Sequence, residues 1–206
     1  VLVDYYDFDD LITISLPDEY VYAGKVAYLS NGMMLTVEDI LELLLIYSAN
    51  DAAYAAAMAV TGDINKFVEE MNNKAKDIGM NNTVFLNPDG LDQDGNKTTL
   101  GDLLFMSLEF IDNYKLIALT SKKSFTSDFT GTQKDYYSTN QLIDNGYIGI
   151  KTGWTSRAGL TFVGLNVDND RQILTIVNKS VVDENKIKNF DETQIRYNSL
   201  LYTYEA

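Results

Sequence analysis

The chain has 206 residues, of which 46% are hydrophobic, with no cysteine and no histidine, and 30 acidic residues against 16 basic ones give a net charge of −14. The length predicts one folded domain, and the acidic balance argues against nucleic acid as a partner. The missing residue types exclude a disulfide, Cys or His zinc ligation, the Ser-His-Asp triad and the Cys-His dyad, so any proton transfer must use Lys, Asp, Glu, Tyr or a hydroxyl.

The N-terminal segment, Val1–Tyr6, is predicted to be the end of a helix. The chain begins with Val rather than Met, no signal peptide is visible, and no apolar run reaches membrane-spanning length. We therefore expect further residues before this segment in the parent protein. Residues 11–15 alternate between apolar and polar and predict a short strand that Pro17 ends, and residues 20–32 predict a mixed loop or short-strand region.

Two capping signatures predict helices in the middle of the chain. Thr36 is followed three residues later by Asp39 and then by an apolar run, and Thr99 with Asp102 repeats the pattern. Asp51 is predicted to cap an alanine-rich helix. These signatures and the apolar spacing predict helices at residues 36–46, 52–60, 64–78, 103–111 and 115–119.

A long loop is predicted at residues 81–97, where turn-forming residues are frequent. Its segment Asp92-Gln93-Asp94-Gly95-Asn96 is similar to the start of a calcium-binding loop. However, Lys97 stands where such a loop needs glycine, and no glutamate closes it at the twelfth position. We therefore predict a polar turn there, and the sequence leads us to expect no metal and no cofactor.

The last third of the chain predicts an antiparallel sheet. Residues 122–137 are polar with interspersed aromatic residues and predict one or two strands, and the turn residues at 168–170 predict a hairpin between two later strands. A C-terminal helix with Asp191 as its N-cap is also expected. The remaining expected elements are strands at residues 147–151, 160–166 and 172–177 and a helix at 192–204.

Helices in the middle of the chain followed by an antiparallel sheet indicate an α+β fold rather than alternating strands and helices. We expect a single domain, residues 1–206. In this domain, residues 33–120 form a helical lobe, and residues 1–32 and 121–206 form a lobe that contains the sheet.

The strand segment Lys151-Thr152-Gly153 offers a cation beside a hydroxyl, which is suitable chemistry for seating a carboxylate. We expect the chain to turn at Gly153. An ordinary strand with one exposed lysine could have the same sequence, because short motifs recur by chance.

A second candidate, Ser48-Ala49-Asn50, lies between two predicted helices, where the break exposes its side chains. Its serine can relay a proton, and its asparagine can hold a peptide group. Both are also common helix-break residues.

The two segments together resemble two of the three motifs of penicillin-recognising serine enzymes. Residues 43–53 resemble the second-motif helix of the D-alanyl-D-alanine carboxypeptidases, and residues 71–91 resemble the helix and loop that follow in that family. Residues 138–142 and 149–164 resemble its third-motif region. The resemblance covers nearly the whole chain. It implies a DD-peptidase or serine β-lactamase-like fold, with an antiparallel sheet flanked by helices and a helical lobe.

The remaining motif, Ser-x-x-Lys with the nucleophile, precedes the second motif in the family and is absent from this chain, because no serine has a lysine three residues later. The nearest pattern, residues 120–123, lies too late. By the family pattern, residues 1–4 would end the nucleophile helix, which places the serine roughly two to three turns upstream. Either the chain begins after it, or the parent is a degenerate homologue. We also expect the N-terminal strands of the sheet to be missing, with an exposed edge or face beside residues 160–177.

The resemblance implies a serine-type carboxypeptidase that trims peptidoglycan stem peptides ending in D-Ala-D-Ala through an acyl-enzyme and that binds β-lactams. It implies that Ser48 relays a proton, that Asn50 holds the substrate peptide and that the backbone N–H of Trp154 donates to the oxyanion. Lys151 and Thr152 would bind the terminal carboxylate. The implied catalytic residues are Ser48, Asn50 and Lys151, and the implied substrate-binding residues are Thr152, Gly153, Trp154 and Thr155.

Without a nucleophile, the 206-residue chain is expected to be inactive. Two alternatives stay open from the sequence. One is a non-catalytic module that binds peptidoglycan peptides, and the other is a β-lactamase, which would need a deacylating glutamate near the site. The resemblance further implies an extracellular or cell-envelope location in a bacterium. Any membrane association of the parent would lie outside this chain.

Overall fold

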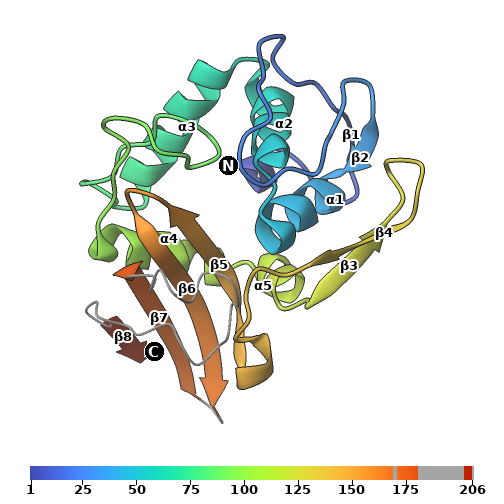
Figure 1. Cartoon of the computed structure of the whole chain (residues 1–206). Coiled ribbons are helices and arrows are strands. Elements are labelled where there is room, and N and C mark those ends of the chain that lie inside the picture. The colour runs from blue at the N-terminus through green and yellow to red at the C-terminus, as the bar shows by residue number, and fades with distance from the viewer. Residues whose placement is uncertain (169–170, 181–201, 206) are drawn as a thin grey trace.

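The structure, a computed structural model, describes residues 1–168, 171–180 and 202–205. Figure 1 shows helices above and behind a twisted sheet. The helices are η1 (Leu2–Asp4), α1 (Val37–Leu41), η2 (Glu42–Tyr47), α2 (Asn50–Thr61), α3 (Ile64–Asp77), α4 (Leu100–Ile111), α5 (Tyr114–Thr120) and η3 (Ile143–Asn145). The strands are β1 (Leu11–Thr13), β2 (Met34–Thr36), β3 (Ser124–Ser127), β4 (Lys134–Tyr137), β5 (Tyr147–Thr155), β6 (Gly159–Asp168), β7 (Arg171–Ser180) and β8 (Tyr202–Glu205).

The main sheet is antiparallel, with the strand order β5-β6-β7-β8. Two separate pairs, β1–β2 and β3–β4, are also antiparallel. Helices α4 and α5 cover one face of the main sheet, and α1, α2 and α3 lie beyond its upper end (Figure 1). This arrangement confirms the α+β class. The predicted lobe boundaries stay a prediction.

Two apolar clusters hold these layers together. In the helical part, the run through α1 and η2 supplies the centre, because Val37, Ile40 and Leu43 are fully buried. In the sheet, Ile150 and Ile176 pack against apolar residues of α4 and α5. Within the described part of the chain, every helix is too short or too polar to cross a bilayer.

Both capping signatures are confirmed as helix starts. Thr36 accepts a hydrogen bond from the backbone N–H of Asp39, whose carboxylate accepts one from the backbone N–H of Thr36, so the capping box is complete. Thr99 likewise caps α4. The Asp102 carboxylate, by contrast, accepts from the N–H of Asn82 and the hydroxyl of Thr83, which fastens the start of the 81–97 loop to α4.

The predicted capping role of Asp51 is wrong. Helix α2 begins at Asn50, two residues before its predicted start at residue 52, with Ala49 as its N-cap. The fully buried Asp51 carboxylate accepts hydrogen bonds from the backbone N–H groups of Ala27, at 2.9 Å, and Leu29, at 2.8 Å. Asp51 therefore holds the 26–29 segment against α2, a long-range contact that no local pattern indicates.

The predicted turn at Gly153 is also wrong, because β5 continues to Thr155 and the turn lies at residues 156–158. Gly153 pairs with Thr161 of β6, and a Cβ at Gly153 would lie 2.6 Å from the Thr161 hydroxyl. The glycine therefore permits close packing of two strands instead of a reversal of the chain.

The expected C-terminal helix is contradicted at its end. Residues 192–201 lie outside the described residues, but residues 202–205 form strand β8, which pairs with β7 along Ile173–Ile176. The sequence Tyr-Thr-Tyr favours a strand, since aromatic and β-branched residues suit a pleated sheet. The expected exposed sheet edge beside residues 160–177 is not present along Ile173–Ile176, because β8 pairs with β7 there. In the described residues, the main sheet takes no strand from before residue 147.

Gly149 is expected to be essential for the position of β5. It has a φ of +41° at a bulge between Ile148 and Ile150, and a Cβ there would overlap the Thr120 side chain of α5, 2.5 Å from its Cβ. We expect Gly149→Ala to lower the free energy of unfolding by about 2–4 kcal/mol through overpacking and backbone strain. Chemical denaturation followed by circular dichroism measures this.

The control is Gly101→Ala in α4, where the nearest atom lies 3.9 Å from the new Cβ and φ is not positive. Alanine is there expected to stabilise the chain by about 0.5–1 kcal/mol, because it reduces the conformational entropy of the unfolded state. A Gly149→Ala variant as stable as the wild type would contradict the packing between α5 and β5.

Candidate active site

The Ser48 side chain is presented by an abrupt end of helix η2. Ser48 adopts the left-handed conformation, with φ 67° and ψ 43°, which is uncommon for a residue other than glycine. The N–H groups of both Ser48 and Ala49 are bonded to the Leu43 carbonyl, and α2 starts at the next residue. The helix therefore breaks at Ser48, as the sequence predicted, and the next helix begins at Asn50, before its predicted start at residue 52.

Asn50 is fixed by a neighbouring loop. Its backbone N–H donates to the Lys25 carbonyl at 2.8 Å, and its Nδ2 donates to the Ala23 carbonyl at 2.8 Å. Gly24 lies between them, and a Cβ on it would lie 2.6 Å from Nδ2 of Asn50. Because Nδ2 is engaged in this way, Oδ1 is the group of this amide that can accept a hydrogen bond from a ligand.

Lys151 connects the sheet to the helical lobe. Its Nζ donates to Ser48 Oγ at 2.7 Å, across 103 residues of sequence, and to the Thr152 carbonyl at 2.7 Å. Burial, with a smaller contribution from the charge of Lys25, lowers the pKa of Lys151 to about 8. At neutral pH the side chain is thus an ammonium group with two of its three donors occupied and the third available to an anion.

The hydroxyl of Thr152 donates to the Thr139 hydroxyl at 2.6 Å. Thr139 is itself anchored, since its N–H donates to the Ile46 carbonyl at the end of η2. The segment after β4 therefore joins β5 to the helix that carries Ser48. Sequence reasoning included Thr139 only within the family resemblance and gave it no role of its own.

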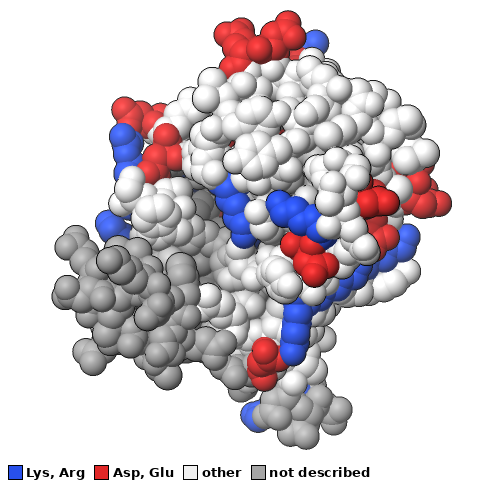
Figure 2. Space-filling view, turned by 45° about the vertical axis from the view of Figure 1, so that its right-hand side comes forward, with Lys and Arg blue, Asp and Glu red and all other residues white. Residues whose placement is uncertain are grey.

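A cleft of about 890 Å³ lies between the helical lobe and the outer edge of β5. All seven predicted site residues line it. Trp154, the single tryptophan of the chain, is 63% exposed at its rim. Figure 2 shows basic and acidic side chains close together across the middle of the molecular face drawn there, with uncharged surface around them. The predicted residues brought together are Ser48, Asn50, Lys151, Thr152, Gly153, Trp154 and Thr155.

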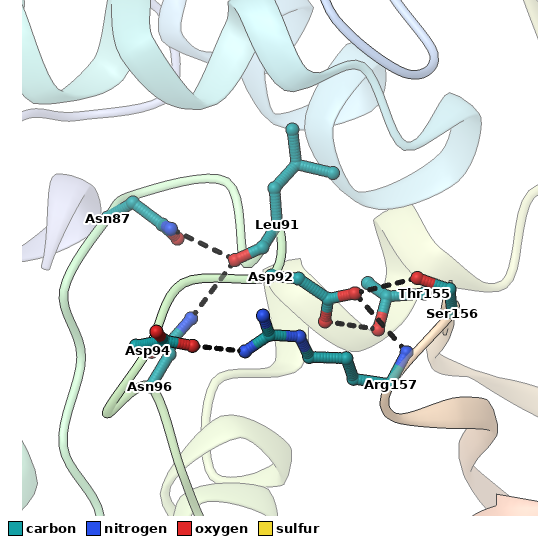
Figure 3. A network of polar contacts seen from close by, with 8 residues as sticks. All are labelled: Asn87, Leu91, Asp92, Asp94, Asn96, Thr155, Ser156 and Arg157. Atoms are coloured by element: carbon teal, nitrogen blue, oxygen red, sulfur yellow. Dashed lines mark hydrogen bonds and ion pairs between the residues drawn. The ribbon is translucent and has the colours of Figure 1, made fainter.

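One end of the cleft is closed by a polar network between the 81–97 loop and the β5–β6 turn (Figure 3). The Asp92 carboxylate accepts hydrogen bonds from the hydroxyls of Thr155, at 2.7 Å, and Ser156, at 3.1 Å, and from the N–H of Arg157, at 3.2 Å. The bond from Thr155 is the main reason why the pKa of Asp92 is lowered. Arg157 also forms an ion pair with the exposed Asp94.

Three charged lining residues were not predicted as part of the site from the sequence: Lys25, Asp89 and Asp92. The first lies in residues 20–32, which were predicted as a loop or short-strand region, and the other two lie in the long loop predicted at residues 81–97. Charged residues in loops are usually solvated, so nothing local marks these as cleft residues. The nearest available signal was the density of polar residues within the 81–97 loop.

Removing the Asp92 carboxylate is expected to loosen the β5–β6 turn. We expect Asp92→Ala to speed hydrogen exchange of the Arg157 amide by about tenfold, because three donors lose their acceptor while the rest of the fold is untouched. Exchange followed by NMR measures this. Asp94→Ala is the matched control, since it removes only an exposed ion pair and should leave the exchange rate within about twofold. Equal rates in both variants would contradict the role of Asp92.

A helical lobe and an antiparallel sheet that meet at a serine–lysine pair define the class of the penicillin-binding-protein fold. A D-alanyl-D-alanine carboxypeptidase from Mycobacterium tuberculosis has a similar structure, with a TM-score of 0.81 at 26% identity over 89% of this chain and 70% of that one. Penicillin-binding protein D2 from Listeria monocytogenes, solved with bound cefotaxime, gives 0.73 at 29% identity over 90% and 75%.

The family profile described as D-alanyl-D-alanine carboxypeptidase, peptidase S11, matches residues 6–181, and the chain belongs to this family. Among curated relatives, the carboxypeptidase DacF of Bacillus subtilis is 34% identical over 66% of this chain and 36% of its own length. DacD of Escherichia coli is 30% identical over 82% and 45%. The chain therefore spans less than half the length of these two relatives.

Proposed function

We propose that the protein is a serine-type D-Ala-D-Ala carboxypeptidase that trims peptidoglycan stem peptides and is acylated by β-lactams. The observation that carries this proposal is the 2.7 Å contact between Lys151 Nζ and Ser48 Oγ inside the cleft. A cation and a hydroxyl at one point of an apolar-walled cleft suit the binding of a carboxylate next to a bond under attack. With this substrate, the proposal includes an extracellular or cell-envelope location in a bacterium.

In this mechanism, the terminal carboxylate of the peptide binds the free donor of Lys151. The Thr152 hydroxyl turns from Thr139 to the same carboxylate. Oδ1 of Asn50 accepts the N–H of a substrate amide, and the backbone N–H of Trp154 on β5 donates to the developing oxyanion. These residues orient the peptide so that its scissile carbonyl faces the nucleophile.

The proton for the leaving amine comes through Ser48. The nucleophilic serine gives its proton to the lysine of its Ser-x-x-Lys motif as its oxygen bonds to the carbonyl carbon. When the C–N bond breaks, the Ser48 hydroxyl gives its proton to the departing nitrogen. Lys151, hydrogen-bonded to Ser48 Oγ, replaces that proton. The lowered pKa of Lys151 favours this transfer at near-neutral pH. The 206 residues supply these groups, but they contain no Ser-x-x-Lys to supply the nucleophile.

The test is labelling with a fluorescent penicillin followed by denaturing electrophoresis. The 206-residue chain is expected to show no covalent label, because no serine in it has the required lysine three residues on. A longer polypeptide that includes upstream residues with a Ser-x-x-Lys sequence is expected to become labelled. Covalent labelling of the 206-residue chain would contradict the assignment of roles.

The Lys151–Ser48 pair in the cleft also suits a second candidate, a non-catalytic module that binds stem peptides at the same place. The two candidates differ in the labelling of the longer polypeptide, which remains unlabelled if the protein is a binding module. Rapid loss of the label after excess drug is removed would instead indicate a β-lactamase, since that enzyme deacylates quickly.

A further inference from the structure

A second lysine, Lys25, lies in the same cleft as Lys151. Its backbone is anchored, because its carbonyl accepts the N–H of Asn50 at 2.8 Å and the adjacent Gly24 packs directly on the Asn50 amide. Its Nζ lies 3.9 Å from the ring centroid of Tyr47, the residue immediately before Ser48. The Lys25 ammonium is therefore placed beside the Ser48–Lys151 pair.

No carboxylate of the described residues forms an ion pair with Lys25. The two acidic residues that line the cleft have other partners. Asp92 is occupied by the β5–β6 turn, and the Asp89 carboxylate accepts the N–H of Leu91, with a pKa that burial raises. Lys25 is exposed to solvent in the cleft, and partial burial lowers its pKa.

Two neighbouring cations repel each other, and this repulsion contributes to the lowered pKa of Lys151. A ligand with a single carboxylate at Lys151 neutralises only one of them. A second anionic group on the ligand would neutralise Lys25 and relieve the repulsion, which gives a reason for the presence of an unpaired lysine in an otherwise acidic protein.

We propose that Lys25 forms an anion subsite that binds a second carboxylate, carried by a side chain of the peptide upstream of its C-terminal D-Ala-D-Ala. This inference rests on the proposed function, since it deepens the substrate class of the same cleft. Lys25 thereby selects dianionic peptides over peptides with the terminal carboxylate alone.

The test compares two peptides that differ in one group: Nα-acetyl-lysyl-D-Ala-D-Ala with either an acetyl or a succinyl group on the lysine Nε. Fluorescence of Trp154, the single tryptophan and a cleft residue, reports binding to the 206-residue chain. At low salt, the wild type is expected to bind the succinyl peptide about three- to fivefold more tightly. Lys25→Gln is expected to remove this preference and Lys25→Arg to keep it.

The control is Lys97→Gln, which removes an exposed lysine of the 81–97 loop that does not line the cleft and should keep the wild-type preference. Equal affinities of the wild type for the two peptides, or a preference that survives in Lys25→Gln, would overturn the Lys25 proposal alone. Failure of the wild type to bind either peptide would overturn the proposed function, and the subsite with it.

Discussion

Lys151→Met is expected to abolish binding of D-Ala-D-Ala peptides and at the same time to stabilise the fold. The variant removes the cation that seats the carboxylate, so affinity should fall by about 30-fold or more. It also removes an ammonium group whose pKa is lowered from 10.5 to about 8 by burial and by Lys25. Holding that charge in the cleft destabilises the folded state by about 1–3 kcal/mol at pH 7. The uncharged methionine side chain has no such cost.

The stability advantage of Lys151→Met over the wild type depends on pH. Between pH 8 and 10.5 the unfolded chain binds more protons at this lysine than the folded chain, so the wild type gains stability from Lys151 as the pH rises through this window. Urea unfolding at pH 7 and pH 9.5 should therefore show a smaller advantage of Lys151→Met at the higher pH. Lys97→Met, at an exposed position, should show no such change. A Lys151→Met variant less stable than the wild type at pH 7 would contradict the desolvation argument.

Asp51→Ala is expected to lower the free energy of unfolding by about 3–5 kcal/mol. It would leave two buried backbone donors, the N–H groups of Ala27 and Leu29, without an acceptor. The loss also releases the segment that carries Lys25, so we expect peptide binding to weaken even where the variant remains folded. Asp51→Ala should therefore lower both the free energy of unfolding and the affinity for the peptide.

Thermal and urea unfolding measure this effect, with two comparison variants. Asp51→Asn keeps one carbonyl acceptor and should lose roughly half as much stability. Asp18→Ala alters an exposed acidic residue and should change stability by less than about 0.5 kcal/mol. An Asp51→Ala loss as small as that of Asp18→Ala would show that the two buried N–H groups find other partners.

Local patterns predicted the elements whose cause is local. Thr36 and Thr99 mark helix starts because an N-cap needs only its own side chain and an N–H three residues on. The break at Ser48–Asn50 was likewise visible as an interruption of two apolar runs. Strands β5, β6 and β7 followed from β-branched residues and turn residues, although β5 extends four residues beyond its predicted end.

The features that sequence patterns missed depend on partners far along the chain. Asp51 binds a segment more than 20 residues away, and Gly153 is required by Thr161 on the neighbouring strand. The contact between Lys151 and Ser48 was expected only because both segments resembled motifs of one family. Lys25 matched no motif, and Asp92 belonged only to a segment similar to the start of a calcium-binding loop. Folding brings both residues to the cleft.

The central claim is that Lys151 and its neighbours seat a terminal carboxylate. The most direct measurement is a Trp154 fluorescence titration at pH 7 with diacetyl-lysyl-D-Ala-D-Ala and with the same peptide as its C-terminal amide. We expect the free acid to bind about tenfold or more tightly than the amide, and this difference to shrink as the pH rises above about 8, where Lys151 loses its proton. Equal binding of the acid and the amide, or a difference that persists in Lys151→Met, would contradict the claim.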